Sequence, residues 1–284
     1  MRVLLPEPFG PMSASRSPSS TVTETLVKSV RAAKCLAIPR AVRRAAMKGE
    51  GRSRGGRRLA PMCSRYVRTT EPKALAKLFG VARPLPALPP KLSVYNIAPP
   101  HRALVVRDNP QRELAVMRWG LVPPGATNVS IGQKMFNARA ETVTQRPAYA
   151  SAFEERRCIV PADGFYEWKE SDGAKQAYYI KRVDGAPMAF AGLWEQKKTR
   201  EGPLETFTIL TTTANAELAP IHGRMPVIMH EAGWRIWLDA EADRDAVMRL
   251  LRPSGAGVLT AIRVGGHVDT LTNDDAECVR SLED

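Results

Sequence analysis

The feature that most constrains this chain is a change of composition at Met62. Residues 1–61 hold 13 Lys and Arg against three Glu, a net charge of +10, and Phe9 is their only aromatic residue. The following 223 residues hold 29 Lys and Arg against 26 acidic residues, a net charge of +3. The first segment has too few large apolar side chains to offset its ordering entropy by burial. We therefore predict a mostly disordered extension over residues 1–61 and one folded domain over residues 62–284.

Three interpretations of the extension stay open on composition alone. Its Arg, Ser and Gly content is typical of a nucleic-acid-binding tail and of an acid-poor transit peptide. It is also what upstream sequence looks like when a start codon is assigned too early. The segment offers one plausible helix, from Thr23 to Ala37, before Pro39.

From Met62 onward, short periodic segments alternate with turn residues, which is typical of a globular domain. A Pro near its start and a following Gly predict a short helix over Lys73–Phe79, and the dipeptide Asp184-Gly185 predicts a hairpin between the strands on either side of it. There is no regular β-α-β alternation. We expect an α+β fold in which a curled, mainly antiparallel sheet forms a barrel-like core with peripheral helices. The remaining predicted strands and helices are Glu113–Trp119, Arg157–Val160, Phe165–Lys169, Ala177–Val183, Met188–Trp194, Thr206–Thr212, Val227–Met229 and Ala261–Val264 as strands, with Ala232–Leu238 and Ala242–Leu251 as helices.

Cysteine and histidine usage argues against several classes of protein. The four cysteines form no C-x-x-C pair, so neither a zinc ribbon nor a disulfide framework is indicated. No two of the four histidines have metal-ligand spacing. No apolar run approaches the ~20 residues of a membrane span. We expect a monomer in the reducing cytoplasm, with no metal, no other cofactor and no membrane association.

Cys63 supports two interpretations. An isolated Cys is most often a small buried apolar residue. If Met62 is the true initiator and is trimmed, however, Cys63 gains a free α-amine beside its thiol. Such an amine titrates near pH 7.7–8.0 and is substantially neutral in a cell. It can attack an aldehyde to form a Schiff base, and the thiol can then close a five-membered thiazolidine ring. An internal Cys could not do this, because its nitrogen would be an amide.

Four further segments contain candidate site residues, each with a plainer alternative. Asn137 could hold a sugar oxygen and Arg139 could grip a phosphate, or both could belong to a polar loop. Glu167 between two aromatic residues has the raised pKa that suits proton transfer, or it points away from them into solvent. His222 has an Arg two residues later and precedes a strand, where loops present catalytic groups, or it is structural or exposed, as most lone histidines are. Trp119 could stack on an unpaired base or pack in the core.

These segments, in this order, resemble the SOS response-associated peptidase family, also called abasic-site processing proteins. The similarity runs from Met62 to about Met229, with a weaker tail. It rests on a set of motifs that together are very unlikely to match by chance. The motifs are M-C-S-R-Y from Met62, Y-N-I-A-P from Tyr95, W-G-L-V-P from Trp119, N-A-R-A-E-T from Asn137, R-C-I-V-P-A-D-G-F-Y-E-W from Arg157, A-G-L-W-E from Ala191 and H-G-R-M-P from His222.

The resemblance implies a protein that recognises abasic sites in single-stranded DNA and links Cys63 to the open-chain sugar aldehyde as a thiazolidine. It implies that Asn137 orients the amine and the sugar, and that Glu167 and His222 move protons. It also implies peptidase activity, chiefly removal of the residues ahead of the Cys, and lyase activity at abasic sites in some members. Positions implied to contact DNA are Arg65, Asn96, Trp119, Leu121, Arg139, Thr211 and Arg224.

Two departures from the family pattern matter. Ser64 stands where the family often has Gly, which is tolerable if φ there is negative. The family reads Cys as residue two, whereas here 62 residues precede it. We therefore expect residues 1–61 to be absent from the working protein, and favour misassigned initiation over processing. The competing hypotheses are a cysteine peptidase acting on other proteins, with His222 as base, and a noncovalent nucleic-acid-binding protein that acts through its basic tail.

Overall fold

The computed structural model describes residues 63–89, 92–108, 110–171 and 173–283. The predicted extension and its helix over Thr23–Ala37 lie outside the described residues. Among the helices that are described, none is long and apolar enough to span a bilayer.

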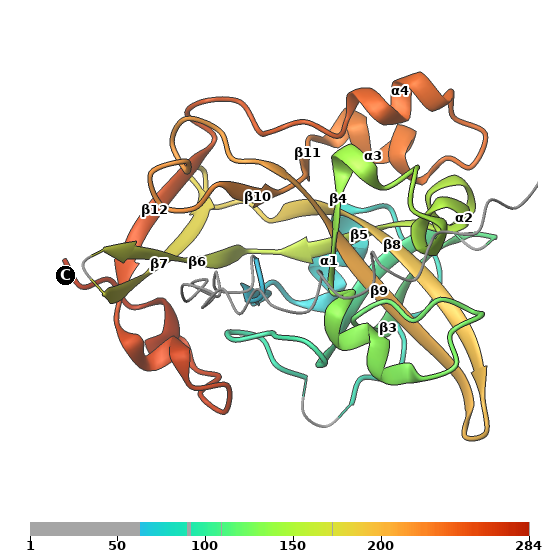
Figure 1. Ribbon diagram of the computed structural model, residues 1–284, viewed down its shortest axis with the longest axis horizontal. Helices are drawn as coiled ribbons and strands as arrows, with labels where there is room; N and C mark the ends of the chain where they lie inside the picture. The colour runs from blue at the N-terminus through green and yellow to red at the C-terminus, as the bar shows by residue number, and fades with distance from the viewer. Residues whose placement is uncertain (1–62, 90–91, 109, 172, 284) are drawn as a thin grey trace, which may run out of the picture. The chain divides into compact units, whose positions relative to one another are not determined.

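A closed five-stranded barrel forms the centre of the fold (Figure 1). Its strands are β2 (Arg102–Asp108), β3 (Arg112–Trp119), β5 (Arg157–Ala162), β8 (Met188–Thr199) and β9 (Gly202–Thr213), paired in the order β9-β3-β2-β5-β8 and closed by β8 on β9. The pairs are antiparallel except β3 with β9. The predicted α+β class and curled, mainly antiparallel sheet are confirmed.

Shorter strands extend the barrel sheet. On β9, β4 (Asn137–Arg139) pairs in parallel and β10 (Arg224–Pro226) in antiparallel fashion, while β11 (Ile228–Met229) pairs with β8. A second sheet has the order β1 (Tyr66–Val67), β6 (Gly164–Ser171), β7 (Ala174–Arg182) and β12 (Leu259–Val264). Strands of both sheets therefore contain candidate site residues that were predicted from the sequence.

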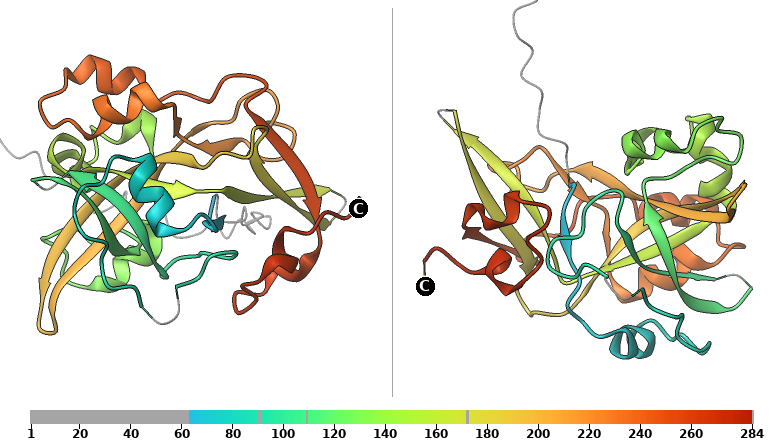
Figure 2. Two further views of the ribbon diagram at one scale, coloured as in Figure 1. Left: turned by 180° about the vertical axis from the view of Figure 1, so that it is seen from behind. Right: turned by 90° about the horizontal axis from the view of Figure 1, so that it is seen from below.

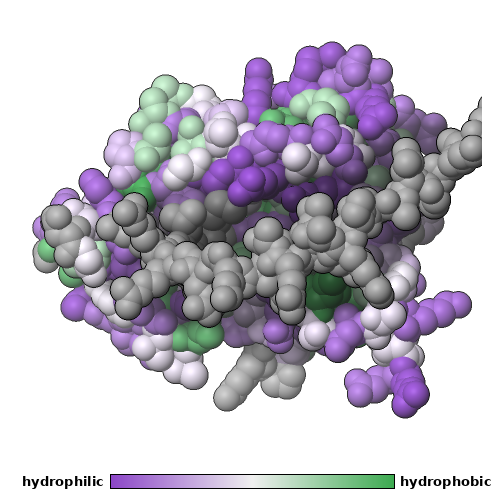
Figure 3. All heavy atoms as spheres, in the orientation of Figure 1, coloured by the Kyte–Doolittle hydropathy of each residue, from purple (hydrophilic) through white to green (hydrophobic). Residues whose placement is uncertain are grey.

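Helices and 3-10 turns gather at two places. Helices α2 (Pro147–Glu155) and α3 (Glu231–Leu238) pack on β5, with α4 (Arg244–Arg249) beside α3. The C-terminal turns η4 (Gly266–Asp269) and η5 (Ala276–Val279) lie beside the smaller sheet in both views of Figure 2. The remaining elements are α1 (Pro72–Leu78), η2 (Val129–Lys134) and η3 (Ala140–Thr142). In the view of Figure 3, hydrophobic side chains show only as small separate patches.

The strands of the barrel are buried on both faces. Along β2, Val105 belongs to one buried cluster with Met117, Phe190 and Phe207, which fills the barrel interior. Its neighbours Leu104 and Val106 belong to a second cluster with the helix residues Phe153 and Trp237, between the barrel and its helices. Because successive side chains of a strand point to opposite faces, one strand serves both cores.

One turn prediction is wrong. Asp184-Gly185 does form a tight turn, with φ of +70° at Gly185. The strands on either side of it do not pair, however. β7 pairs with β6 and β12, whereas β8 pairs with β5, β9 and β11. The turn therefore connects the two sheets instead of closing a hairpin.

Candidate active site

Strand pairing brings Cys63 to Glu167 although 104 residues separate them. β1 runs antiparallel to β6, with Tyr66 opposite Phe165, and the Tyr166 N–H donates to the carbonyl of Arg65. Continuing this register by two residues places Ser64 opposite Glu167, and Cys63, one residue further, lies within hydrogen-bond distance of the Glu167 side chain. The motif at Met62 and the motif at Arg157 thus meet through ordinary sheet geometry.

One carboxylate oxygen of Glu167 accepts from both functional atoms of Cys63. The backbone N–H of Cys63 donates to Oε1 at 2.8 Å, and Sγ donates to the same oxygen at 2.7 Å. Glu167 is 3% exposed, so the alternative of a solvated side chain is wrong. Because successive side chains of a strand point to opposite faces, the Glu167 side chain points away from its two aromatic neighbours and toward Cys63.

Burial controls the protonation of this pair. It raises the pKa of the Glu167 carboxyl, opposed by the His222 ring and by the hydrogen bonds from Cys63. Burial also raises the pKa of the Cys63 thiol well above its ordinary value, and the charge and hydrogen bond of Glu167 raise it further. The site therefore favours a neutral thiol and a carboxyl that holds its proton to a higher pH than an exposed Glu.

Asn137 and His222 complete the group around Cys63. Asn137, the first residue of β4, donates from Nδ2 to the Cys63 carbonyl at 3.3 Å. His222 lies in the loop from β9 to β10, and its Nδ1 is 3.8 Å from Glu167 Oε1. The four residues predicted as catalytic are thus brought together.

The backbone of Arg224 sets the tautomer of His222. Its N–H donates to His222 Nδ1 at 3.1 Å, so in the neutral ring Nδ1 accepts and Nε2 carries the hydrogen. The carbonyl of Arg224 lies 3.2 Å from the same nitrogen. The ring nitrogen of His222 that faces Glu167 is therefore the one that accepts from the Arg224 backbone, and it carries no hydrogen in this tautomer.

The Arg224 side chain is held by the protein. Its guanidinium donates to both oxygens of Glu141, at 2.6 and 2.9 Å, and to the carbonyl of Thr211 at 2.6 Å. The hydrogen bonds from Arg224 lower the pKa of the Glu141 carboxyl. Thr211 is itself 0% exposed. A phosphate could reach Arg224 only in competition with Glu141.

Arg65 and Asn96 are joined to the C-terminal segment. Arg65 donates to Asn96 Oδ1 at 3.0 Å and to the Val268 carbonyl at 2.6 Å. The fully buried Asn96 donates from Nδ2 to carbonyls of this segment, including that of Asn273 at 2.9 Å. Asp274 accepts from the backbone N–H groups of residues 94, 95 and 96. This arrangement holds the chain just after Cys63 in place.

Trp119 and Leu121 lie in the core. They are 1% and 0% exposed, and the Trp119 indole N–H donates to the Phe136 carbonyl at 2.7 Å. In this structure neither side chain offers a surface on which a base could stack, because each is enclosed by its neighbours. Packing, the plainer alternative for Trp119, describes both residues.

The departure at Ser64 is accommodated. Among the non-glycine residues that are described, Cys63 has the one positive φ, +42°, and Ser64 has none. A left-handed conformation costs a non-glycine residue roughly 1–2 kcal/mol. The φ angle of Cys63 is measured from the carbonyl carbon of residue 62. The cost of this left-handed conformation therefore exists only while residue 62 is attached.

Two hollows flank the cysteine. One, of about 390 Å³, is lined by Ser64, Arg65, Pro99, Pro100 and Phe136 among others. The second, of about 140 Å³, is lined by Asn137 and Thr211 and by three cations, Lys134, Arg139 and Arg146; we call it the basic hollow. Phe136 and Asn137 are consecutive, so one short segment separates the two.

Arg139, which the resemblance implies to contact a phosphate, is exposed and lines the basic hollow. Lys134 and Arg146 were missed by the sequence reasoning. Each lies outside the recognised motifs, at the end of η2 and at the N-cap of α2. Proximity to the N-A-R-A-E-T motif was the only signal that could have found them.

One further cluster has metal-ligand chemistry within the described residues: His267, Asp275 and Cys278. Asn273 Nδ2 lies 3.2 Å from His267 Nδ1 and donates to the His267 carbonyl at 2.8 Å, so Nδ1 accepts and Nε2–H donates to Asp275 at 3.1 Å. These hydrogen bonds account for the cluster without an ion.

Comparisons with known proteins agree with this geometry. The family model for SOS response associated peptidase (SRAP) matches residues 62–271. The chain is 38% identical over 224 residues to abasic site processing protein YoqW of Bacillus subtilis, covering 78% of this chain and 100% of YoqW. It is 30% identical to abasic site processing protein YedK of Escherichia coli, with the same two coverages.

Solved structures show the same fold. A protein from Bacteroides thetaiotaomicron aligns with a TM-score of 0.70 at 23% identity, over 77% of this chain and 99% of its own. A protein from Bordetella bronchiseptica aligns with a TM-score of 0.62 at 29% identity, over 72% of this chain and 100% of its own. With its motifs assembled around Cys63 and the family model spanning most of its length, the chain belongs to the SOS response associated peptidase (SRAP) family.

Proposed function

We propose that this protein processes abasic sites in single-stranded DNA by linking Cys63 covalently to the sugar aldehyde. The observation that carries the proposal is the shared oxygen of Glu167, which accepts from both the nitrogen and the sulfur of Cys63. Aminothiol chemistry needs these two atoms to act in sequence on one carbon. The names of the relatives YoqW and YedK support the same substrate.

The working form in this proposal begins at Cys63. In the full chain the Cys63 nitrogen is an amide and cannot attack an aldehyde. Once residue 62 is gone, an α-amine occupies the position from which the N–H now reaches Glu167. Loss of residue 62 also removes the cost of the positive φ at Cys63.

The chemistry then follows in two balanced steps. The neutral amine adds to the C1′ aldehyde and gives a carbinolamine. Glu167, whose pKa is raised by burial, acts as the acid: it gives its proton to the departing hydroxyl, which leaves as water, and an iminium forms. The thiol then passes its proton to the Glu167 carboxylate, and Sγ adds to the iminium carbon. The product is a thiazolidine, one water is released, and Glu167 recovers its proton.

The neighbouring residues take supporting roles. Asn137 holds the Cys63 carbonyl and so fixes the direction of the amine. His222 exchanges a proton with Glu167 after the ring moves from its present Nδ1–Oε1 distance of 3.8 Å to hydrogen-bond distance. The DNA strand runs across the two hollows, with phosphates at Lys134, Arg139 and Arg146. Flanking apolar contacts come from Pro99, Pro100 and Phe136 on the other side of the cysteine.

A cysteine peptidase acting on other proteins is less well supported. Such enzymes use a thiolate, whose formation requires a thiol pKa lowered by a nearby cation. Here burial raises the pKa of the Cys63 thiol, and its hydrogen bond goes to Glu167 and not to His222. A neutral thiol suits addition to an iminium already formed on the same residue. Peptidase activity in this proposal is limited to release of Cys63.

The decisive experiment uses protein that begins at Cys63 and a labelled single-stranded oligonucleotide with one abasic site. We expect an adduct that survives denaturation and has the summed mass minus one water. A tetrahydrofuran analogue, which has no aldehyde, should give none. Protein whose Cys63 is N-acetylated should also give none. Equal crosslinking by the acetylated protein would overturn the proposal, as would peptide hydrolysis in trans without any DNA adduct.

A further inference from the structure

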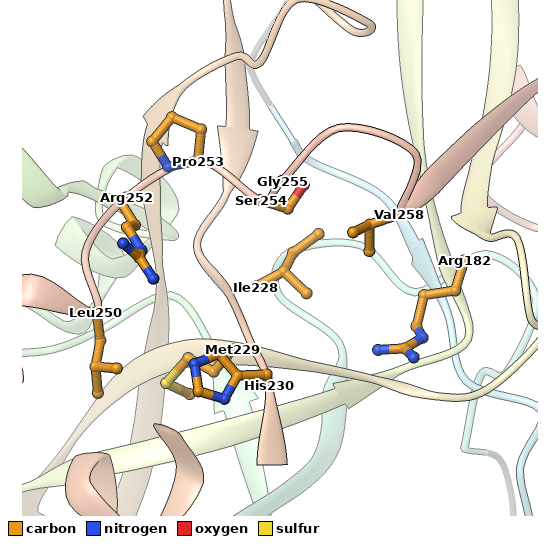
Figure 4. A pocket seen from close by; sticks show the side chains of 10 residues that line it. All are labelled: Arg182, Ile228, Met229, His230, Leu250, Arg252, Pro253, Ser254, Gly255 and Val258. Atoms are coloured by element: carbon orange, nitrogen blue, oxygen red, sulfur yellow. The ribbon is translucent and has the colours of Figure 1, made fainter. Parts of the chain in front are cut away.

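A third pocket lies away from Cys63, where β11, the end of β7 and the segment after α4 meet (Figure 4). Its volume is about 320 Å³. Neither the catalytic group nor the two hollows beside it share a lining residue with this pocket.

The floor of the pocket is aliphatic. Ile228, Met229, Leu250 and Val258 line it, and no aromatic side chain does so, apart from the imidazole of His230. Nucleobases are typically bound by stacking on aromatic rings. An aliphatic floor instead suits a branched or aromatic side chain of a peptide, which gains by leaving water.

The rim of the pocket is cationic. Arg182 and Arg252 line it, and no acidic residue does. Arg182 is already paired with Asp184. Within the described part of the chain, the Arg252 side chain has no ion pair, and Figure 4 shows its guanidinium directed toward the pocket rather than away from it. The free charge is therefore concentrated at Arg252, beside apolar surface.

We propose that this pocket binds a short acidic segment of a partner protein, with an apolar side chain on the aliphatic floor and a carboxylate at Arg252. The argument is charge complementarity. An unpaired guanidinium next to a concave apolar surface matches a carboxylate next to an apolar side chain, and Arg binds carboxylates in a bidentate manner. The inference does not depend on the chemistry proposed for Cys63.

Position in the fold gives the pocket a connection to the catalytic loop. Glu217 accepts from the backbone N–H of Gly257 at 2.5 Å, and Asn215 reaches Ser254 at 3.4 Å. These contacts tie the segment that borders the pocket to the loop that carries His222. A partner bound here would therefore sit next to the catalytic loop without covering Cys63.

The test uses protein that begins at Cys63 and a fluorescent hexapeptide that alternates Asp or Glu with Leu. Two matched peptides replace either every Leu by Ser or every acid by its amide. We expect saturable binding of the first peptide in fluorescence anisotropy, and at least about tenfold weaker binding of each matched peptide. The affinity should fall as salt rises, because the charged contact is at the rim.

Variants locate the binding. Arg252→Glu should weaken it at least about tenfold, since repulsion replaces attraction. Arg249→Glu is the matched control, because Arg249 is a highly exposed arginine on α4 that does not line the pocket. Gly255→Trp tests the shape, since a Cβ there would meet Val258 at 3.9 Å and a larger side chain would fill the space. Crosslinking to abasic DNA should persist in all three, which shows that they fold.

Three results would overturn the inference. Absence of saturable binding is the first. The second is a loss of peptide binding in Arg249→Glu as large as that in Arg252→Glu, because the effect would then reflect the overall charge and not the pocket. If an intact single-stranded oligonucleotide, and not the peptide, lost binding in Arg252→Glu, the pocket would be a nucleic-acid subsite instead.

Discussion

One oxygen of Glu167, Oε1, accepts hydrogen bonds from the two reactive atoms of Cys63, its nitrogen and its sulfur. Neither of the other two cysteines that the structure describes, Cys158 and Cys278, has such an arrangement. Cys278, for example, is equally buried, but its Sγ faces a backbone carbonyl at 3.5 Å. Variants of Cys63 and Cys278 can therefore separate the effect of burying a thiol from the effect of placing it beside Glu167.

We predict that Cys63→Ser, in protein that begins at residue 63, loses the adduct that survives denaturation. The variant keeps its α-amine, so the imine still forms and can be trapped with borohydride. Without ring closure by sulfur, the imine should instead promote strand cleavage at the abasic site. Denaturing gels with and without borohydride measure both products. Cys278→Ala is the control and should crosslink normally; a stable adduct in Cys63→Ser would contradict the role of the sulfur.

Glu167→Gln should slow adduct formation by about 10²- to 10⁴-fold, the usual range for loss of a general acid or base. In the unmodified protein the rate should rise with pH as the α-amine loses its proton, near pH 7.7–8.0 for an ordinary terminus. It should fall again once Glu167 ionises, at a higher pH than for an exposed Glu, because burial raises its pKa. Single-turnover rates across pH measure both limbs.

The alkaline limb should vanish in Glu167→Gln and remain in Glu170→Gln, which changes an exposed carboxyl on the same strand.

The raised pKa of Glu167 also has a consequence for stability. A carboxyl whose pKa is higher folded than unfolded destabilises the fold as the pH rises between the two values. Glu167→Gln should remove this loss, as denaturant unfolding at several pH values would show. If the pH dependence of stability were the same in Glu167→Gln as in the unmodified protein, the raised pKa could not be assigned to Glu167.

Elements with alternating or aromatic-rich patterns were predicted well, and those defined by distant contacts were not. The predicted runs at Glu113, Phe165 and Thr206 fall within β3, β6 and β9. β2 was missed because Leu104, Val105 and Val106 are all buried, so the segment does not alternate. α2 was missed because Arg146 at its N-cap makes no side-chain capping bond. β4 has three residues and exists only because β9 lies beside it.

We predict that Gly120→Ala destabilises the protein by on the order of 3 kcal/mol. Gly120 has φ of +115°, and an added Cβ would lie 2.5 Å from the backbone oxygen of Gly132. This contact fixes η2, which leads directly into Phe136 and Asn137. The substitution should therefore also lower crosslinking.

Denaturant unfolding measures the change in stability. Gly125→Ala is the matched control, because a Cβ there meets nothing within 4 Å and its φ is ordinary. It should leave both stability and crosslinking within experimental error. Equal behaviour of the two variants would show that the close approach of Gly120 to Gly132 does not constrain the site.

Across the whole molecule, the sequence predicted which residues gather around Cys63 better than it predicted which cations the fold leaves without an ion pair. The motifs that contain Cys63, Asn137, Glu167 and His222 are contiguous strings, and strand pairing brings them together. Charge pairing is not visible in such strings. Arg65 and Arg224 read as free cations, yet the fold assigns one to backbone carbonyls and the other to Glu141. The cations left unpaired include Arg139, from a motif, and others that no motif contains.

Because the fold pairs some of its arginines internally, the net charge of +13 does not give the number of phosphate contacts. A strongly basic binding domain would contact many phosphates and lose affinity steeply with salt. Residues 62–284, with a net charge of +3, offer the basic hollow of Lys134, Arg139 and Arg146. Three phosphate contacts on a single strand give a slope of log K against log salt of about −2.

We predict this slope for protein that begins at Cys63, binding a single strand that carries the unreactive tetrahydrofuran analogue. Fluorescence anisotropy between about 50 and 200 mM salt measures it. Arg146→Ala should reduce the slope by about 0.7, the contribution of one phosphate on a single strand. Arg244→Ala, which changes an exposed arginine on α4 outside the basic hollow, should leave it unchanged. A slope that is the same in both variants would place the phosphates elsewhere, and a much steeper slope in the full chain would assign the additional contacts to residues 1–61.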